Sequence, residues 1–208
     1  MEITREQVVE ALNIMKKCGI NSPTDWFGDK DRLEKKIREM IALYYKIADK
    51  LHEDWRMGYI QQNQDETGNY PPRWKKIKDK NFISKLDPNN LPSNIRLNEG
   101  VYEIDIAHSP FERLSPDWQY ENLEAAKIVA CLAIRKGSVI EGEADLSLEE
   151  VGEIIHSAWL ERNSWAKEDG VLSKPYAELP AVEQEKDIKQ YKIALRTYQS
   201  MKEIVDTP

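Results

Sequence analysis

Apolar residues recur every three or four positions through most of this chain, which is the spacing that places them on one face of an α-helix. The pattern predicts a short helix near the N-terminus and four longer ones, over about residues 30–61, 116–136, 148–165 and 181–205. Residues 62–109 break the pattern and are rich in turn-forming asparagine, glycine and proline, so we expect an irregular excursion there. Within it, VYEIDI alternates and fits either a short strand or an extended arm.

Residues at the predicted helix ends support these assignments. Thr4 is a candidate cap for the first helix and Gly19 its stop. Ser115 precedes a proline that suits a first helical turn, and Gly137 follows the same helix. Ser147, with Glu150 three residues later, is a capping box for the helix that follows. The sequence therefore predicts an all-α protein.

A short phrase occurs twice: KLHEDWRMGYIQ contains His52 and Trp55, and IIHSAWLERNSW contains His156 and Trp159. The helices that follow align without gaps, with these pairs: Phe111 and Tyr176, Leu114 and Leu179, Gln119 and Gln184, Leu123 and Ile188, Lys127 and Lys192. We infer an internal duplication of a helix–loop–helix unit, with a long loop insertion in the first copy. A pseudo-two-fold arrangement of the copies would bring the two His–Trp phrases together.

This duplication predicts three parts: an N-terminal helical extension over residues 1–36, a first repeat over 37–137 and a second over 138–208. Net charge is −7 and the isoelectric point is near 5.2, which disfavours a general nucleic-acid binder. No apolar run reaches the length of a membrane span, and the N-terminus lacks a signal peptide's apolar centre. Cys18 and Cys131 are isolated, so neither a disulfide framework nor a zinc site is indicated. We expect a soluble, cytoplasmic protein.

The second unit resembles the RyR repeat, a small helical module found in tandem pairs in ryanodine receptors and alone in bacterial and phage proteins. The shared features, within about residues 146–201, are Ile155-His156-Trp159, Pro175-Tyr176, Leu179-Pro180 and Glu183-Lys186-Asp187. The first unit, about residues 40–136, is similar more loosely, with Ser115 where proline is usual. Neither unit has the family's glycine-tryptophan-x-x-glycine phrase.

The resemblance implies an adenine-nucleotide site between two repeats, formed by the helix tryptophans. Carried over to this chain, it selects Trp55 and Trp159 as opposite walls of a clamp and adds Tyr176 as a ligand-binding candidate. Base stacking on each indole would contribute about 1–3 kcal/mol. The alternative is that both tryptophans are core residues, which is the usual role of an apolar stripe on a helix.

Histidines and basic residues supply candidates for phosphate recognition. His52 and His156 could donate to a phosphate or orient the indoles, but we favour a structural role in which each bonds a loop carbonyl. Arg73 and Lys75 lie in PPRWKKIKDK, the only dense basic segment, where a planar guanidinium with lysines nearby suits a phosphate. A solvated charged loop is an equal alternative. Arg162 and Lys174 are weaker candidates.

Motifs for catalysis are weak. HEDW resembles the start of a zinc-protease phrase, but Arg56 stands where the second histidine is required. A metal-dependent hydrolase using Asp105 or Glu121 is a minor third hypothesis. We therefore expect a non-catalytic protein, without cofactor or metal, that senses or sequesters an adenine-containing nucleotide and is compatible with a homo-oligomer. The main alternative is a protein-interaction scaffold with buried tryptophans.

Overall fold

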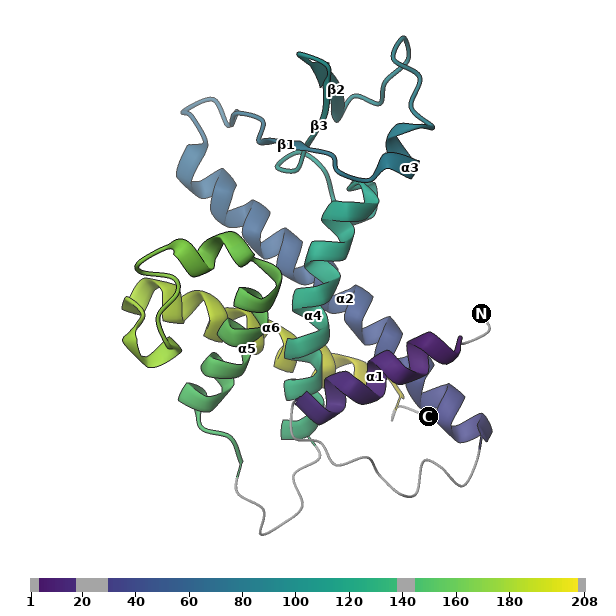
Figure 1. The fold of residues 1–208 in the computed structure, drawn as a ribbon, viewed down its shortest axis with the longest axis vertical. Helices are drawn as coiled ribbons and strands as arrows, with labels where there is room; N and C mark the ends of the chain where they lie inside the picture. Colours follow the sequence, from purple (N-terminus) through teal and green to yellow (C-terminus); the bar gives the residue numbers. More distant parts are fainter. Residues whose placement is uncertain (1–3, 18–29, 138–144, 206–208) are drawn as a thin grey trace. The chain divides into compact units, whose positions relative to one another are not determined.

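The computed structural model describes residues 4–17, 30–137 and 145–205 (Figure 1). Five long helices account for most of these residues: α1 (Arg5–Lys17), α2 (Lys30–Asn63), α4 (Pro116–Lys136), α5 (Leu148–Arg162) and α6 (Ala181–Val205). The shorter helical elements are α3 (Lys80–Ile83) and the 3₁₀ helices η2 (Phe111–Arg113), η3 (Ser164–Glu168) and η4 (Tyr176–Glu178). No helix in the described ranges is long and apolar enough to cross a membrane.

The helix ends follow the local signals in the sequence. Helix α1 begins directly after Thr4, while the predicted stop at Gly19 lies outside the described residues. Ser147 accepts a hydrogen bond from the Glu150 backbone and the Glu150 carboxylate accepts one from the Ser147 backbone, so the capping box is confirmed. Helix α5 ends at Arg162, earlier than predicted, because Asn163 adopts non-helical backbone angles before η3 begins.

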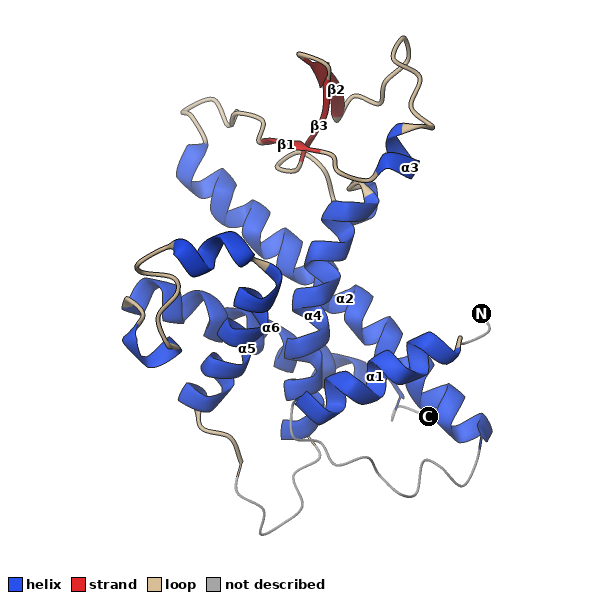
Figure 2. Ribbon diagram, in the orientation of Figure 1, coloured by secondary structure: helices blue, strands red, loops and turns tan. Residues whose placement is uncertain are grey.

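The prediction of a purely all-α fold is wrong in one respect. Three short strands, β1 (Trp74–Lys76), β2 (Ile95–Asn98) and β3 (Val101–Asp105), form an antiparallel sheet in the order β1-β3-β2 (Figure 2). Strands β2 and β3 are joined through Glu99 and Gly100, which both have positive φ, as a tight hairpin with right-handed twist requires. Ile95 and Ile104 pair across the hairpin and are both buried. The turn and this apolar pair explain why the segment forms a sheet.

The chain divides into two compact units. One contains Met1–Ile47 with Ala125–Pro208, and the other contains Ala48–Glu124. Helices α2 and α4 therefore each have residues in both units. The core of the first includes Ile37, Ile47, Val129, Leu132 and Val151. The core of the second includes Leu51, Ile77, Ile104, Phe111 and Leu114. Each unit thus buries its own set of apolar side chains and holds one of the two His–Trp phrases.

Candidate functional site

Three rings follow one another along α2 in the unit of residues 48–124. Trp55 stacks on His52 with ring centroids 5.7 Å apart and an interplanar angle of 19°. Trp55 also stacks on Tyr59, at 5.6 Å and 24°. The spacing of three and four residues puts these rings on one side of the helix. Trp55 is half-buried, so it is neither a fully enclosed core residue nor a free surface ring.

Arg73, on the segment that leads into β1, lies beside these rings. Its guanidinium carbon is 5.7 Å from the centroid of Trp55 and 5.7 Å from that of Tyr59, within the range of a cation–π contact. The side chain is exposed. No residue among those the structure describes accepts a hydrogen bond from the guanidinium or pairs with its charge. We call His52, Trp55, Tyr59 and Arg73 the aromatic–arginine cluster.

The backbone of Arg73 is fixed by the buried Asp105. Asp105 Oδ1 accepts hydrogen bonds from the backbone N–H of Arg73 at 2.9 Å and of Ala107 at 3.1 Å. Its Oδ2 lies 2.6 Å from Nδ1 of His108, whose ring stacks on Tyr70 at 4.3 Å. Asp105, one candidate of the hydrolase hypothesis, therefore holds together the loop that presents Arg73. Sequence reasoning missed this role because it depends on the pairing of β1 with β3.

The other basic candidate of the first unit lies elsewhere. Lys75 follows Arg73 by two residues, and its Nζ is 6.0 Å from the ring of Trp118 on α4. Lys75 is half-buried beside that indole, and the structure shows no contact between its Nζ and Trp55. Of the two predicted phosphate-binding residues, Arg73 is the one that the structure brings next to Trp55.

Both histidines of the repeated phrase bond loop carbonyls. His52 Nε2 is 2.8 Å from the oxygen of Ser109, and His156 Nε2 is 3.0 Å from the oxygen of Lys174. A carbonyl only accepts, so each Nε2 carries a proton directed at the protein rather than at a ligand. Both side chains are buried, and burial lowers the pKa of His52. The structural role that we favoured is the one observed.

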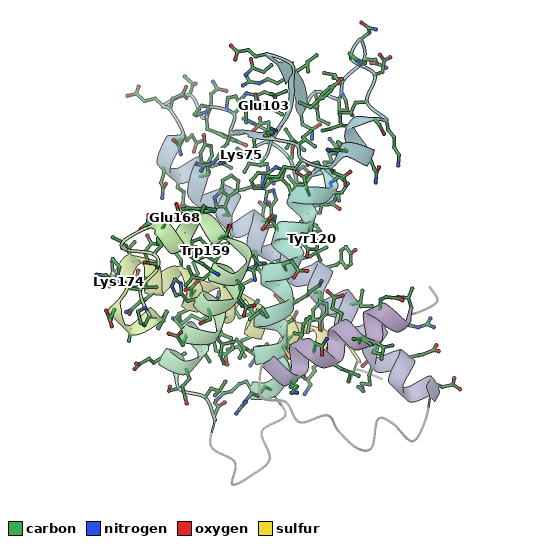
Figure 3. All side chains as sticks on the ribbon, viewed as in Figure 1. Lys75, Glu103, Tyr120, Trp159, Glu168 and Lys174 are labelled. Atoms are coloured by element: carbon green, nitrogen blue, oxygen red, sulfur yellow. The ribbon has the colours of Figure 1, made fainter. Side chains whose placement is uncertain are left out.

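Trp159 is the counterpart of Trp55 in the unit that contains α5 and α6. It stacks on His156 with centroids 6.0 Å apart at 21°, and it meets Trp165 edge-on at 5.8 Å and 84°. Trp159 is half-buried, whereas Trp165 is 60% exposed. Figure 3 labels Trp159 on α5 and Lys174 on the loop before η4. Trp165 was not predicted, although it stands in the same quoted phrase.

The remaining candidates of the second repeat are engaged within the protein. Arg162 Nη1 donates to the carbonyl of Ala158 at 2.8 Å, within its own helix. The carbonyl of Lys174 accepts the bond from His156, while its side chain is exposed. Tyr176 is buried and its hydroxyl donates to the carbonyl of Gln184 at 3.3 Å. Burial, with a smaller contribution from the nearby Asp187 charge, raises the pKa of Tyr176.

The contacts around the two His–Trp phrases correspond closely. The carbonyl that each histidine binds belongs to the residue two before a buried aromatic, Phe111 in one case and Tyr176 in the other. Each aromatic begins a 3₁₀ helix, and each 3₁₀ helix is followed by a buried leucine with nearly the same backbone angles. The leucines are Leu114, at φ −67° and ψ 152°, and Leu179, at φ −68° and ψ 151°.

A glutamine reaches back to the 3₁₀ helix in both cases. Gln119 Nε2 donates to the carbonyls of Phe111 at 3.3 Å and Glu112 at 3.2 Å. Gln184 Nε2 donates to those of Tyr176 at 3.0 Å and Ala177 at 3.3 Å. The residues that align in sequence thus make the same hydrogen bonds, each within its own unit.

A buried carboxyl group beside the histidine distinguishes the second phrase from the first. Asp187 Oδ2 lies 3.8 Å from His156 Nδ1, and both side chains are almost fully buried. Burial, reinforced by the Glu183 carboxylate and opposed by Lys186, raises the pKa of Asp187 to about 7. The aligned residue of the first repeat is Asn122, which carries no charge.

An open groove of about 730 Å³ runs along α6 beside the start of α5. Its lining comprises Leu148, Glu149, Tyr176, Ala177, Ala181, Gln184, Glu185, Ile188, Lys189 and Lys192. Both signs of charge are present, and Leu148 is 56% exposed. Sequence patterns do not predict this groove, because it depends on which helix faces remain uncovered.

Comparisons with family models, with curated proteins and with solved structures match nothing to this chain. Within residues 4–17, 30–137 and 145–205, no group of three or more His, Cys, Asp and Glu side chains is arranged to hold a metal ion. The aromatic–arginine cluster and the groove are therefore judged by their own chemistry.

Proposed function

We propose that this protein binds an adenine-containing nucleotide without turning it over, and that the aromatic–arginine cluster supplies part of the site. The observation that carries the proposal is the exposed Arg73 guanidinium, which lies beside Trp55 and Tyr59 and has no acceptor among the described residues. A nucleotide combines the two groups that this arrangement suits, a flat base for aromatic stacking and phosphates for a planar guanidinium.

Competition between the base and Arg73 is part of this proposal. In the structure, the guanidinium lies near the two aromatic rings and has no hydrogen-bond acceptor among the described residues. A phosphate would offer charge-assisted hydrogen bonds, which are about twice as strong as neutral ones. Arg73 would then turn to the phosphate and leave the indole to the base.

We also propose that the two His–Trp segments are RyR-type repeats of one ancestral hairpin, supported by their matching contacts. On that basis Trp159 is a second stacking surface, and the sandwich of one ligand by Trp55 and Trp159 stays a prediction. Trp165, which meets Trp159 edge-on, would be part of that second surface.

Calorimetric titration with linear and cyclic adenine nucleotides tests the proposal, followed by tryptophan fluorescence, which stacking should quench. Arg73→Ala should weaken binding about tenfold or more while leaving the melting temperature nearly unchanged, because the side chain is exposed. Arg96→Ala is the matched control: Arg96 also covers an indole, Trp74 at 4.3 Å, but is paired with Glu103. Its loss should leave nucleotide affinity unchanged.

Two results would reject the function. A parent protein that binds no adenine nucleotide leaves the interaction scaffold as the better explanation. Equal losses in Arg73→Ala and Arg96→Ala would show that the effect is a general change of charge rather than a site. Trp159→Ala then tests the sandwich separately, since lost affinity with a retained fold is expected only if both tryptophans contact the ligand.

A further inference from the structure

His108 differs from the other two histidines of the chain in what its ring nitrogens contact. His52 and His156 are buried and direct Nε2 at a backbone carbonyl. His108 is bonded through Nδ1 instead, and its side chain is 42% exposed. No described residue forms a hydrogen bond with its Nε2. The exposed histidine therefore presents a ring nitrogen that the fold does not use.

Asp105 determines which nitrogen of His108 faces outward. Its carboxylate is buried, and Oδ1 accepts hydrogen bonds from the backbone N–H groups of Arg73 and Ala107. Oδ2 lies 2.6 Å from His108 Nδ1. A carboxylate only accepts hydrogen bonds, so Nδ1 carries the proton of this contact. The bond at one ring nitrogen sets the state of the other, which leaves Nε2 available to a ligand.

Helix α2 anchors the chain on both sides of His108. Arg56 Nε donates to the carbonyl of Ala107 at 3.0 Å, and His52 bonds the carbonyl of Ser109 at 2.8 Å. Both side chains come from the turns of α2 that carry the aromatic–arginine cluster, within the unit of residues 48–124. The backbone of His108 is thus held against the same part of α2 as the cluster.

One carboxylate therefore holds two basic residues. Asp105 binds Arg73 through its backbone and His108 through its ring, so the two points of attachment are only the width of a carboxylate apart. Tyr70 stacks on one face of the His108 ring at 4.3 Å, which favours a ligand at the ring edge, where Nε2 lies. A planar guanidinium together with an imidazole N–H is a donor set that suits phosphate oxygens.

We propose that His108 Nε2 and the Arg73 guanidinium bind the phosphates of the nucleotide as one subsite. The inference rests on the proposed function, because it assigns the phosphate end of that ligand to named residues. A phosphate oxygen only accepts hydrogen bonds, so His108 takes up a proton from solvent at Nε2 and binds as the imidazolium. Adenosine, which has no phosphate, does not use this subsite.

Reaction with diethyl pyrocarbonate tests the assignment, because the reagent modifies an unprotonated, accessible imidazole nitrogen. Mass spectrometry of the peptide around each histidine gives its rate. His108 should react fastest, since Nε2 of His52 and of His156 is bonded and buried. ADP at ten times its dissociation constant should slow the reaction of His108 about tenfold. Inorganic tripolyphosphate should also slow it, and adenosine should not.

Substitution of His108 provides the second measurement. His108→Gln should weaken ADP binding about tenfold and leave adenosine binding nearly unchanged, because only the phosphate contact is lost. Lys78→Gln is the matched control, since it removes an exposed positive charge from the same excursion of the chain. Its affinity for ADP should equal that of the parent.

The outcomes separate this subsite from the proposed function. Unchanged ADP affinity in His108→Gln, with the expected loss in Arg73→Ala, would overturn the subsite and leave the function in place. Protection of His108 by adenosine as strong as that by ADP would also overturn it, because the ring would then meet the nucleoside. Protection by tripolyphosphate in a protein that binds no adenine nucleotide would support the subsite and reject the function. Absence of protection by both ADP and tripolyphosphate would overturn the subsite.

Discussion

The ring of Tyr176 packs directly against the backbone of Gly152. A β-carbon built on Gly152 would come within 2.2 Å of the ring Cζ and 2.4 Å of Cε1, closer than any real contact of this kind. The Tyr176 backbone N–H donates to Glu153 Oε2 at 2.9 Å, which fixes the start of η4 beside the same turn of α5. Gly152 is therefore the residue that lets the loop of the second repeat close onto α5.

Replacement of Gly152 by alanine should destabilise the protein by about 1–3 kcal/mol, because the added methyl forces either the tyrosine ring or the helix to move. The gain in helix propensity, roughly 1 kcal/mol, is smaller than the expected strain. Equilibrium unfolding in urea measures the difference.

Gly58→Ala is the matched control for this substitution. Gly58 also lies inside a helix, α2, but nothing approaches within 4 Å of the position that its β-carbon would take. Alanine there should stabilise the protein by about 0.5–1 kcal/mol. Stabilisation by both substitutions would show that Tyr176 moves aside without cost.

Loss of His156 should cost about 1–3 kcal/mol, because His156→Ala leaves the carbonyl of Lys174 without its donor and opens space beneath Trp159. His108→Ala provides a comparison, since the His108 side chain is 42% exposed and should contribute less than about 1 kcal/mol. Denaturant-induced unfolding of the two variants measures the loss of unfolding free energy in each. Equal small effects would mean that the buried bond of His156 does not hold the loop.

The raised pKa of Asp187 predicts an unusual pH dependence. A carboxyl group with a higher pKa in the folded protein binds its proton more tightly there than in the unfolded chain. The stability that protonated Asp187 contributes is therefore fully present below pH 3.8 and is lost as the pH rises to about 7. Asp187→Asn introduces the residue that the first repeat has at the aligned position, Asn122. The variant should not lose stability as the pH rises through this range. The variant should be more stable than the parent by roughly 1–4 kcal/mol above pH 7.

Unfolding free energies measured across this pH range check the sign. The groups that face Asp187 are His156, Tyr176, Glu183 and Lys186, and none of them is replaced in the variant. A variant whose stability falls with pH as steeply as that of the parent would assign the slope to another group. A variant that is less stable than the parent above pH 7 would contradict the expected sign.

The capping box of α5 offers a local test of the second repeat. Ser147→Ala removes the side-chain acceptor for the Glu150 backbone N–H and should cost about 1 kcal/mol. Ser157→Ala, in the same helix, removes only an exposed hydroxyl bonded to Glu153 and should change stability by less than about 0.5 kcal/mol. Thermal melting with circular dichroism compares the two. Similar melting temperatures would mean that the capping box at the N-terminus of α5 does not stabilise the protein.

The sequence predicted the long helices well because each carries an apolar stripe and local end signals, such as Ser147 with Glu150. It did not predict the sheet, since β1 has only three residues and gains its stability from pairing with β3, whose partner residues lie 27–31 positions further along the chain. The histidine–carbonyl bonds followed from the rule that buried polar groups find partners. The Asp105 contacts and the groove could not be foreseen, because both depend on which segments meet in space.

The 39-residue difference between the two loops has a consequence for the order of folding. The bond of His156 to Lys174 joins residues 18 apart, whereas that of His52 to Ser109 joins residues 57 apart. Closing the longer loop costs about 1 kcal/mol more chain entropy, before its sheet adds any contact in return. Since local contacts form faster than distant ones, the second repeat should assemble first and the first repeat only after the β2–β3 hairpin has shortened its loop.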